Sequence, residues 1–194
     1  TLLTLLIIFP LLTYPQPAKY FTKDLYWLDI NNAKKILQIE NGNYVFAASA
    51  KSNTTNMWKP YFVEVNAQGD MLYELDISPD SLQGRLDDLC SVGQNYFAVG
   101  SVFVDEITPW KMCISAVNNS SYNFNNYTFG DECNSKFAQT CALTESGNIL
   151  VGGYINPICS PGKFLYLVKI SPDSEVLLDT VYNYYFNTPN KTNW

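Results

Sequence analysis

The chain has 194 residues, of which 47% are hydrophobic and 15% are charged, and its formal net charge is −6. This balance supports a hydrophobic core and excludes a disordered chain, while the lack of a Lys/Arg cluster argues against a nucleic-acid-binding surface. The sequence contains no histidine, which excludes catalytic triads and zinc sites that depend on imidazole.

The N-terminal segment 1–12 is an apolar run that is too short to span a bilayer and matches the hydrophobic region of a secretory signal. We therefore predict a signal peptide over 1–15, clipped at its N-terminus and cleaved before Gln16, and a secreted or cell-surface protein. A buried apolar strand or helix is the alternative for this segment. No later run approaches the roughly 18 apolar residues of a membrane helix, so no membrane span is expected.

A unit of 52 to 53 residues then recurs three times along the chain. Two strand-like runs keep this period, since each recurs 52 and then another 53 residues further on. The first run is at 42–49, 94–101 and 147–154, and the second is at 62–66, 114–118 and 167–171. Two independent runs with one period near 50 indicate a structural repeat, and several short strands per unit are typical of a β-propeller.

Each unit is expected to form four strands. In the first unit we predict strands at 35–40, 43–49, 61–66 and 71–77, and the turn Asn41-Gly42 between the first two is the strongest short signal for a hairpin. Small residues near the end of the second strand of every unit predict a close backbone approach, as expected where blades converge on a central axis.

The predicted fold is all-β: a β-propeller of four-stranded antiparallel blades at about 31–77, 85–130 and 137–182. The segment 24–30 resembles the fourth strand of the first unit, so we expect it to close the ring by completing the last blade. About three blades are fewer than the four to eight of most propellers. We therefore expect 16–194 to be a partial propeller with an incomplete ring, from the N-terminal portion of a longer protein.

One family resemblance follows from these repeats. The motif Gly42-Asn43-Tyr44-Val45 followed by small residues, together with the later run 62–73, resembles the secreted propeller repeats of bacterial proteins that are exported by type IX secretion. The resemblance covers about residues 20–182 and rests on residues of the repeat framework. It implies a β-propeller and export from the cell.

Trp and Lys recur between the second and third strands of the units. Trp58-Lys59 and Trp110-Lys111 lie 52 residues apart, and Lys163 continues the Lys series after another 52. In a propeller these loops share one face, so a ring of Trp and Lys there is a candidate site for a glycan, an anionic polymer or a protein ligand, because Trp offers a flat apolar surface and Lys a charge. In the structural alternative, the Trp packs between blades and the Lys stem lies along it.

Acidic residues are the candidates for catalysis or metal binding. The pairs at 105–106 and 131–132 are of the type used in glycoside hydrolysis, which needs two carboxyl groups about 5–9 Å apart. The remaining acidic candidates are Asp76, Asp80, Asp87 and Asp88. Their spacing matches no calcium loop, so we expect no metal site, no cofactor and no catalytic residue.

The favoured function is therefore an exported, non-enzymatic binding or scaffold module. The alternative is a propeller-type polysaccharide hydrolase or lyase that has part of its site in missing blades.

The five cysteines occupy no equivalent positions of the repeat and form no Cys-x-x-Cys motif, so a metal site is not expected. Cys90 and Cys141 fall in predicted first strands and have the character of small core residues. Cys133 precedes the third unit, and Cys159 lies in its loop between the second and third strands, on the same face of the predicted blade. Cys133 and Cys159 are therefore a candidate disulfide, and the alternative is two unrelated loop thiols. Closing this loop of about 26 residues would stabilise an exported protein by about 3 kcal/mol.

Overall fold

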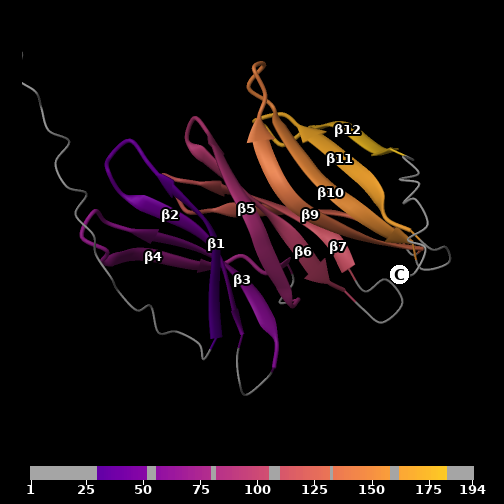
Figure 1. The fold of residues 1–194 in the computed structure, drawn as a ribbon. Coiled ribbons are helices and arrows are strands. Elements are labelled where there is room, and N and C mark those ends of the chain that lie inside the picture. Colours follow the sequence, from indigo (N-terminus) through magenta and orange to yellow (C-terminus); the bar gives the residue numbers. More distant parts are fainter. Residues whose placement is uncertain are drawn as a thin grey trace, which may run out of the picture.

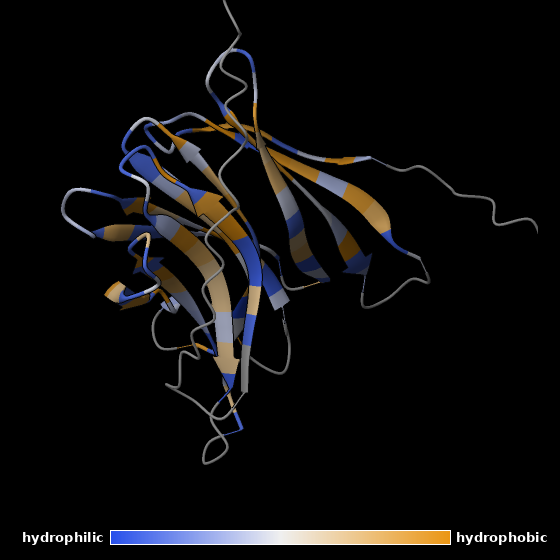
Figure 2. Ribbon diagram, turned by 60° about the vertical axis from the view of Figure 1, so that its left-hand side comes forward, coloured by the Kyte–Doolittle hydropathy of each residue, from blue (hydrophilic) through white to orange (hydrophobic). Residues whose placement is uncertain are grey.

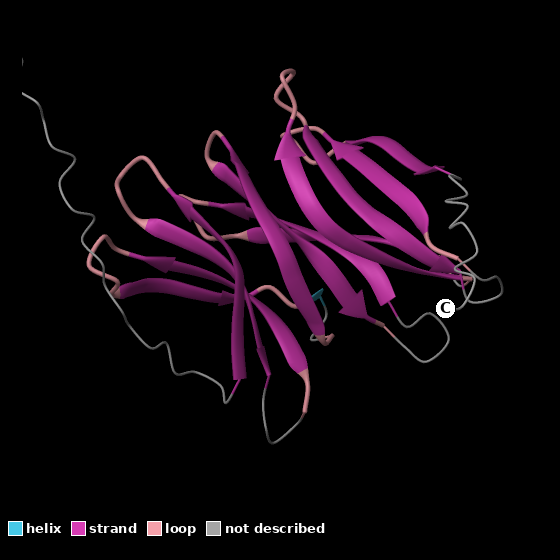
Figure 3. Ribbon diagram, viewed as in Figure 1, coloured by secondary structure: helices cyan, strands magenta, loops and turns pink. Residues whose placement is uncertain are grey.

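The computed structural model describes residues 30–51, 56–79, 82–104, 110–131, 133–157 and 162–182. Within these ranges the chain forms twelve β-strands, which make three four-stranded antiparallel sheets (Figures 1 and 3). The prediction of an all-β protein built from four-stranded antiparallel sheets is confirmed.

The first sheet contains β1 (Ile30–Gln38), β2 (Tyr44–Lys51), β3 (Trp58–Val65) and β4 (Met71–Asp76). The second contains β5 (Gly84–Val92), β6 (Asn95–Phe103), β7 (Trp110–Asn118) and β8 (Phe124–Phe129). The third contains β9 (Asn134–Leu143), β10 (Ile149–Pro157), β11 (Phe164–Ile170) and β12 (Val176–Tyr182). In every sheet the strands lie side by side in chain order, so each hydrogen-bonded neighbour is also the next strand in the sequence.

The sequence of the turns explains where the strands reverse. Four hairpin turns share one pattern, in which the fourth residue donates its backbone N–H to the carbonyl of the first and has a positive φ. The fourth residues are Gly42, Gly69, Gly147 and Ser174. Glycine reaches positive φ without a steric penalty, so the predicted Asn41-Gly42 hairpin forms between β1 and β2.

A β-bulge makes the first strand longer than the sequence predicts. β1 begins at Ile30 rather than at residue 35, because the pairing with β2 shifts between Ala33 and Lys35 and then continues on both sides of the extra residue. The same irregularity recurs in β5 and β9. The extra residues are Lys34, Asp87 and Gln139.

The bulges also explain the glycines in the middle of β6 and β10. A Cβ atom on Gly153 would lie 1.8 Å from the carbonyl oxygen of Phe137, and one on Gly100 would lie 1.9 Å from that of Arg85. Both oxygens belong to the bulged first strand of the same sheet. The expected close approach is therefore present, but its partner is the neighbouring strand and not another blade at a central axis.

Two apolar cores lie between the three sheets, where hydrophobic residues follow the strands (Figure 2). β5 packs against the first sheet and β9 packs against the second, so the second sheet is covered on both faces. The larger buried residues are Val45, Phe62, Ile77, Leu86, Leu89 and Tyr96 in the first core, and Phe97, Met112, Ile114, Ile149, Tyr166 and Val168 in the second. This double coverage buries β6 almost continuously, while β12 at the outer edge is largely exposed.

A buried carboxylate links all three sheets. Asp88 on β5 accepts a hydrogen bond from the hydroxyl of Thr140 at 2.8 Å and another from the backbone N–H of Cys141 at 2.9 Å, both on β9. Its other oxygen lies 3.6 Å from the ammonium of Lys35 on β1. Lys35, Asp88 and Thr140 each follow the bulge of their own strand, so the contact joins equivalent positions of the three sheets.

A second buried carboxylate, that of Glu64 near the C-terminal end of β3, joins the first two sheets. Glu64 accepts a hydrogen bond from the side-chain amide of Asn43 at 2.8 Å and one from the hydroxyl of Tyr122 at 2.9 Å. Burial and the neighbouring carboxylate raise the pKa of Tyr122 to about 12. Tyr122 therefore stays protonated at neutral pH, and its hydroxyl group donates a hydrogen bond to Glu64.

Two sequence predictions fall on residues that the structure does not describe. The signal peptide at 1–15 lies wholly outside the described ranges, and of the expected ring-closing strand at 24–30 only Ile30 lies within them, as the first residue of β1. Across the described ranges, no helix has the length and apolar character needed to cross a membrane.

The glycine pair in β10 gives a direct test of the bulge geometry. Gly153→Ala should lower the free energy of unfolding by about 2–3 kcal/mol, because the added methyl group meets a backbone carbonyl that is fixed by strand pairing. Gly152→Ala is the matched control, since its Cβ would find no heavy atom closer than 3.4 Å. Urea unfolding of both variants measures the difference, and equal losses of stability would contradict the geometry.

Candidate functional site

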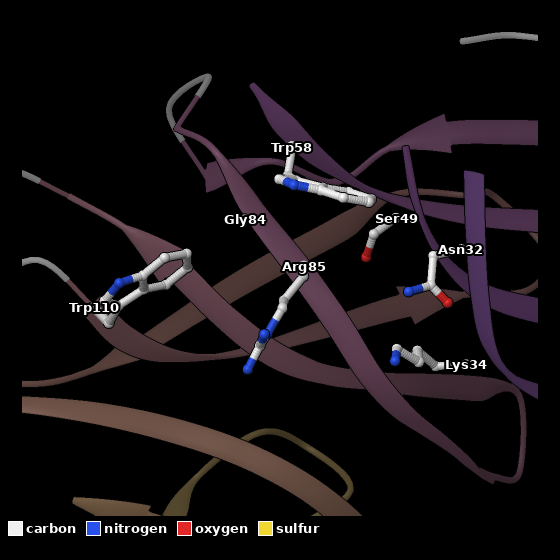
Figure 4. Close-up of a pocket in the computed structure, with 7 residues that line it drawn as sticks. All are labelled: Asn32, Lys34, Ser49, Trp58, Gly84, Arg85 and Trp110. Atoms are coloured by element: carbon white, nitrogen blue, oxygen red, sulfur yellow. The ribbon is translucent and has the colours of Figure 1, made fainter. Parts of the chain in front are cut away.

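A pocket of about 310 Å³ lies between the first and second sheets, at the end where β2 leads to β3. Its lining comes from β1, β2, β3, β5 and β7 (Figure 4). The lining residues are Asn32, Lys34, Ser49, Trp58, Gly84, Arg85 and Trp110. The volume is at the small end of the range of about 300–1,000 Å³ for small-molecule sites, so the pocket suits a compact ligand.

The two tryptophans flank the strand that carries Gly84 and Arg85 (Figure 4). Trp58 is the first residue of β3 and Trp110 the first residue of β7, and each is paired with the preceding strand of its sheet. The sequence predicts loops at these positions, but strand pairing holds both backbones in the sheets. Both side chains are half-buried, so each ring is positioned by its strand and keeps part of its surface exposed.

The three lysines of the predicted binding ring do not line this pocket. Lys59 donates to Asp76 at 2.7 Å, and this hydrogen bond raises the pKa of Lys59. The stem of Lys111 lies against Gly130, and the ammonium of Lys163 lies 4.5 Å from the centre of the Tyr154 ring. The structure thus brings together the two predicted tryptophans but not the lysines that accompany them.

The positive charge of the pocket comes instead from Lys34 and Arg85, which the sequence analysis did not single out. Arg85 is the single arginine of the chain, and this rarity is the signal that could have drawn attention to it. Lys34 is the bulge residue of β1, a position that no local sequence pattern marks. Both side chains are exposed.

Asp87 moderates this charge from beside the pocket. Its carboxylate lies 3.3 Å from Nε of Arg85. Burial raises the pKa of Asp87 above its usual value, although Arg85 and Lys34 favour the ionised form. The seven described lining residues include no carboxylate, so they provide no acid–base pair for glycoside hydrolysis.

At the corresponding junction between the second and third sheets, larger side chains occupy the equivalent positions. Fifty-two residues after Gly84 and Arg85, the chain carries Lys136 and Phe137. Lys136 is buried, and the ring of Phe137 lies 5.8 Å from that of Trp110, centre to centre. The first junction stays open because a glycine and an extended arginine occupy the positions that a buried lysine and an aromatic ring fill in the second.

The other acidic candidates form no metal site within the described ranges. Asp80, Asp105, Glu106 and Glu132 lie outside the described residues. Asp131 accepts hydrogen bonds from Asn134 at 2.7 Å and from the backbone of Cys133 at 3.0 Å. Burial opposes ionisation of Asp131, but these hydrogen bonds and the charge of Lys136 lower its pKa. Among the described residues, no group of three or more acidic or cysteine side chains is placed to hold a metal ion.

No disulfide joins the four described cysteines to one another. Cys90 lies on β5 and Cys141 on β9, and the proximity of the two thiols lowers the pKa of Cys90 and raises that of Cys141. Cys133 is exposed, and its predicted disulfide partner Cys159 lies outside the described residues. The disulfide between Cys133 and Cys159 therefore stays a prediction.

Comparison with known protein families finds no matching family model, and a search of curated proteins finds no matching relative. The function is therefore inferred from the geometry of the pocket and from the sequence.

Peptide mapping without reductant tests the predicted disulfide. In protein purified from an oxidising compartment and denatured with an alkylating agent, we expect Cys133 and Cys159 in one cross-linked peptide pair. Cys113 should be recovered alkylated, because it is buried on β7 in the second sheet and forms no disulfide with another described cysteine. Recovery of alkylated Cys133, or a cross-link between Cys133 and a cysteine other than Cys159, would contradict the predicted pairing.

Proposed function

We propose that this chain is an exported, non-enzymatic β-propeller module that binds a carbohydrate in the pocket between its first and second sheets. The observation that carries the proposal is the position of Trp58 and Trp110. Two half-buried indole rings reach one compact pocket together with the polar groups of Asn32 and Ser49. A sugar ring has an apolar C–H face that stacks on an aromatic ring and a rim of hydroxyl groups that need hydrogen-bond partners, and this lining supplies both.

The repetition of one packing arrangement supports the propeller. The second sheet packs on the first through its first strand, and the third packs on the second in the same way. Phe97 and Ile114 are fully buried under the third sheet. Their equivalents 53 residues later, Leu150 and Leu167, are apolar but only half-buried on the outer face of the third sheet. Apolar residues at these positions suit contact with a further sheet of the same kind, which a ring of blades supplies.

The sequence supports export. The apolar run at 1–12 matches the hydrophobic region of a secretory signal, and the repeat motifs resemble those of secreted bacterial propellers. Outside the cell, an open pocket between two blades meets soluble glycans and surface polysaccharides directly. A binding role also agrees with a lining whose described residues contain aromatic, amide, hydroxyl and basic groups.

Tryptophan fluorescence tests the proposal, because the ligand contacts two of the four tryptophans of the chain. Titration with an array of soluble oligosaccharides should shift the emission with at least one of them. Trp58→Ala should weaken that binding about tenfold, the loss expected for one stacking contact of about 1.4 kcal/mol, whereas Trp58→Phe should keep most of it.

Tyr182→Ala is the matched control, since Tyr182 is an exposed aromatic residue on the far edge of the third sheet. It should leave the affinity unchanged. Binding that survives unaltered in both Trp58→Ala and Trp110→Ala would place the site elsewhere and refute the proposal.

A further inference from the structure

We propose that the sugar held in this pocket is an acidic one and that Arg85 recognises its carboxylate. This inference rests on the proposed function, since it specifies the ligand of the same pocket. A hexuronic acid unit combines a pyranose ring for the tryptophans with one carboxylate for the arginine.

The distribution of charge is the first argument. The chain as a whole is acidic, with a net charge of −6 and only 12 basic residues among 194. Two of those basic residues, Lys34 and Arg85, nevertheless line this one small pocket, and its seven described lining residues include no acidic side chain. A locally positive cavity on a negative protein favours an anion over a neutral molecule at close range.

The geometry of Arg85 is the second argument. Its Nε faces Asp87 at 3.3 Å, and the guanidinium group carries further N–H donors beyond Nε. In Figure 4 the side chain extends from β5 between Trp110 on one side and Lys34 on the other. Because guanidinium donors are arranged as a planar fork, they bind a carboxylate through two parallel hydrogen bonds.

Comparison between the repeats is the third argument. The residue equivalent to Arg85 in the third sheet is Phe137, whose ring packs at a tilt against Trp110 and stacks on Tyr154. An aromatic ring therefore meets the packing needs of this position. An exposed arginine at this position instead presents a charge and several N–H donors to the pocket, and these suit a ligand.

Replacing Asp87 should change the affinity for an acidic sugar in the opposite direction from replacing Arg85. Its carboxylate competes with an anionic ligand for Arg85, and it reduces the positive charge beside the pocket. Asp87→Asn should therefore increase the affinity for an acidic sugar, while Arg85→Gln should decrease it. A purely structural role of this pair does not predict opposite changes.

The experiment compares three probes by isothermal titration calorimetry with the full chain. They are a trimer of galacturonic acid, the neutral trimer of galactose, and a peptide of three glutamates, which carries carboxylates without sugar rings. We expect the acidic sugar to bind more tightly than the other two. Arg85→Gln should lose about 10- to 100-fold of this affinity, as expected for hydrogen bonds between charged groups, and Arg85→Lys should recover part of it.

Lys169→Gln serves as the matched control, because it removes one positive charge from the third sheet, outside the pocket lining. Circular dichroism verifies that every variant keeps its strand content. Equal affinity for the acidic and neutral sugars, with binding still dependent on Trp58, overturns the inference but leaves the proposed function standing. Equal affinity for the peptide overturns the sugar as the ligand. No binding of any of the three probes overturns the acidic sugar, whereas the carbohydrate site itself is decided by the oligosaccharide array.

Discussion

The buried carboxylate of Asp88 is the contact on which the arrangement of the three sheets depends. Backbone hydrogen bonds hold the strands of each sheet together, but apolar packing between the sheets has no directional preference. Asp88 supplies that direction, since its two oxygens reach Lys35 on β1 and Thr140 and Cys141 on β9. A buried carboxylate is tolerated only when its hydrogen bonds are satisfied, so this contact also fixes the sheets at one spacing and one register.

The β-bulge makes this contact possible and also positions the pocket. Because the bulge recurs at the same position of β1, β5 and β9, it places the following residues of the three strands where they contact one another. The residues that precede the bulge in β5 and β9 then determine how much space is left between neighbouring sheets. At the first junction, Gly84 and Arg85 leave a cavity beside Trp58, whereas at the second, Lys136 and Phe137 fill the equivalent space beside Trp110. The repeated framework thus carries this pocket at its first junction.

Much of the fold could be predicted from the sequence, because its signals are local. Asn41-Gly42 marks a hairpin by its own conformational preference, and the period of 52 to 53 residues carries that prediction into all three units. The bulges could not be predicted, since an extra residue such as Lys34 is defined only by its pairing with the next strand. The predicted start of β1 at residue 35 was wrong for the same reason.

The site was only half predictable. The spacing of Trp58 and Trp110 indicated a shared face, and both reach the pocket. The accompanying lysines follow the same period but take partners within their own sheets, as Lys59 does with Asp76. Arg85 enters the pocket because β5 packs on the first sheet, a tertiary contact that periodicity does not encode.

A double-mutant cycle on Asp88 and Thr140 tests most directly whether this carboxylate holds the sheets together. Asp88→Asn should lower the free energy of unfolding, measured with urea, by about 3 kcal/mol. The reason is that Lys35 loses its charged partner and the charged hydrogen bonds to β9 become neutral. Thr140→Val should cost less, and the coupling energy between the two should be about 1 kcal/mol or more. Strictly additive effects, or a cost for Asp88→Asn below about 0.5 kcal/mol, the size expected for a surface substitution, would contradict the account.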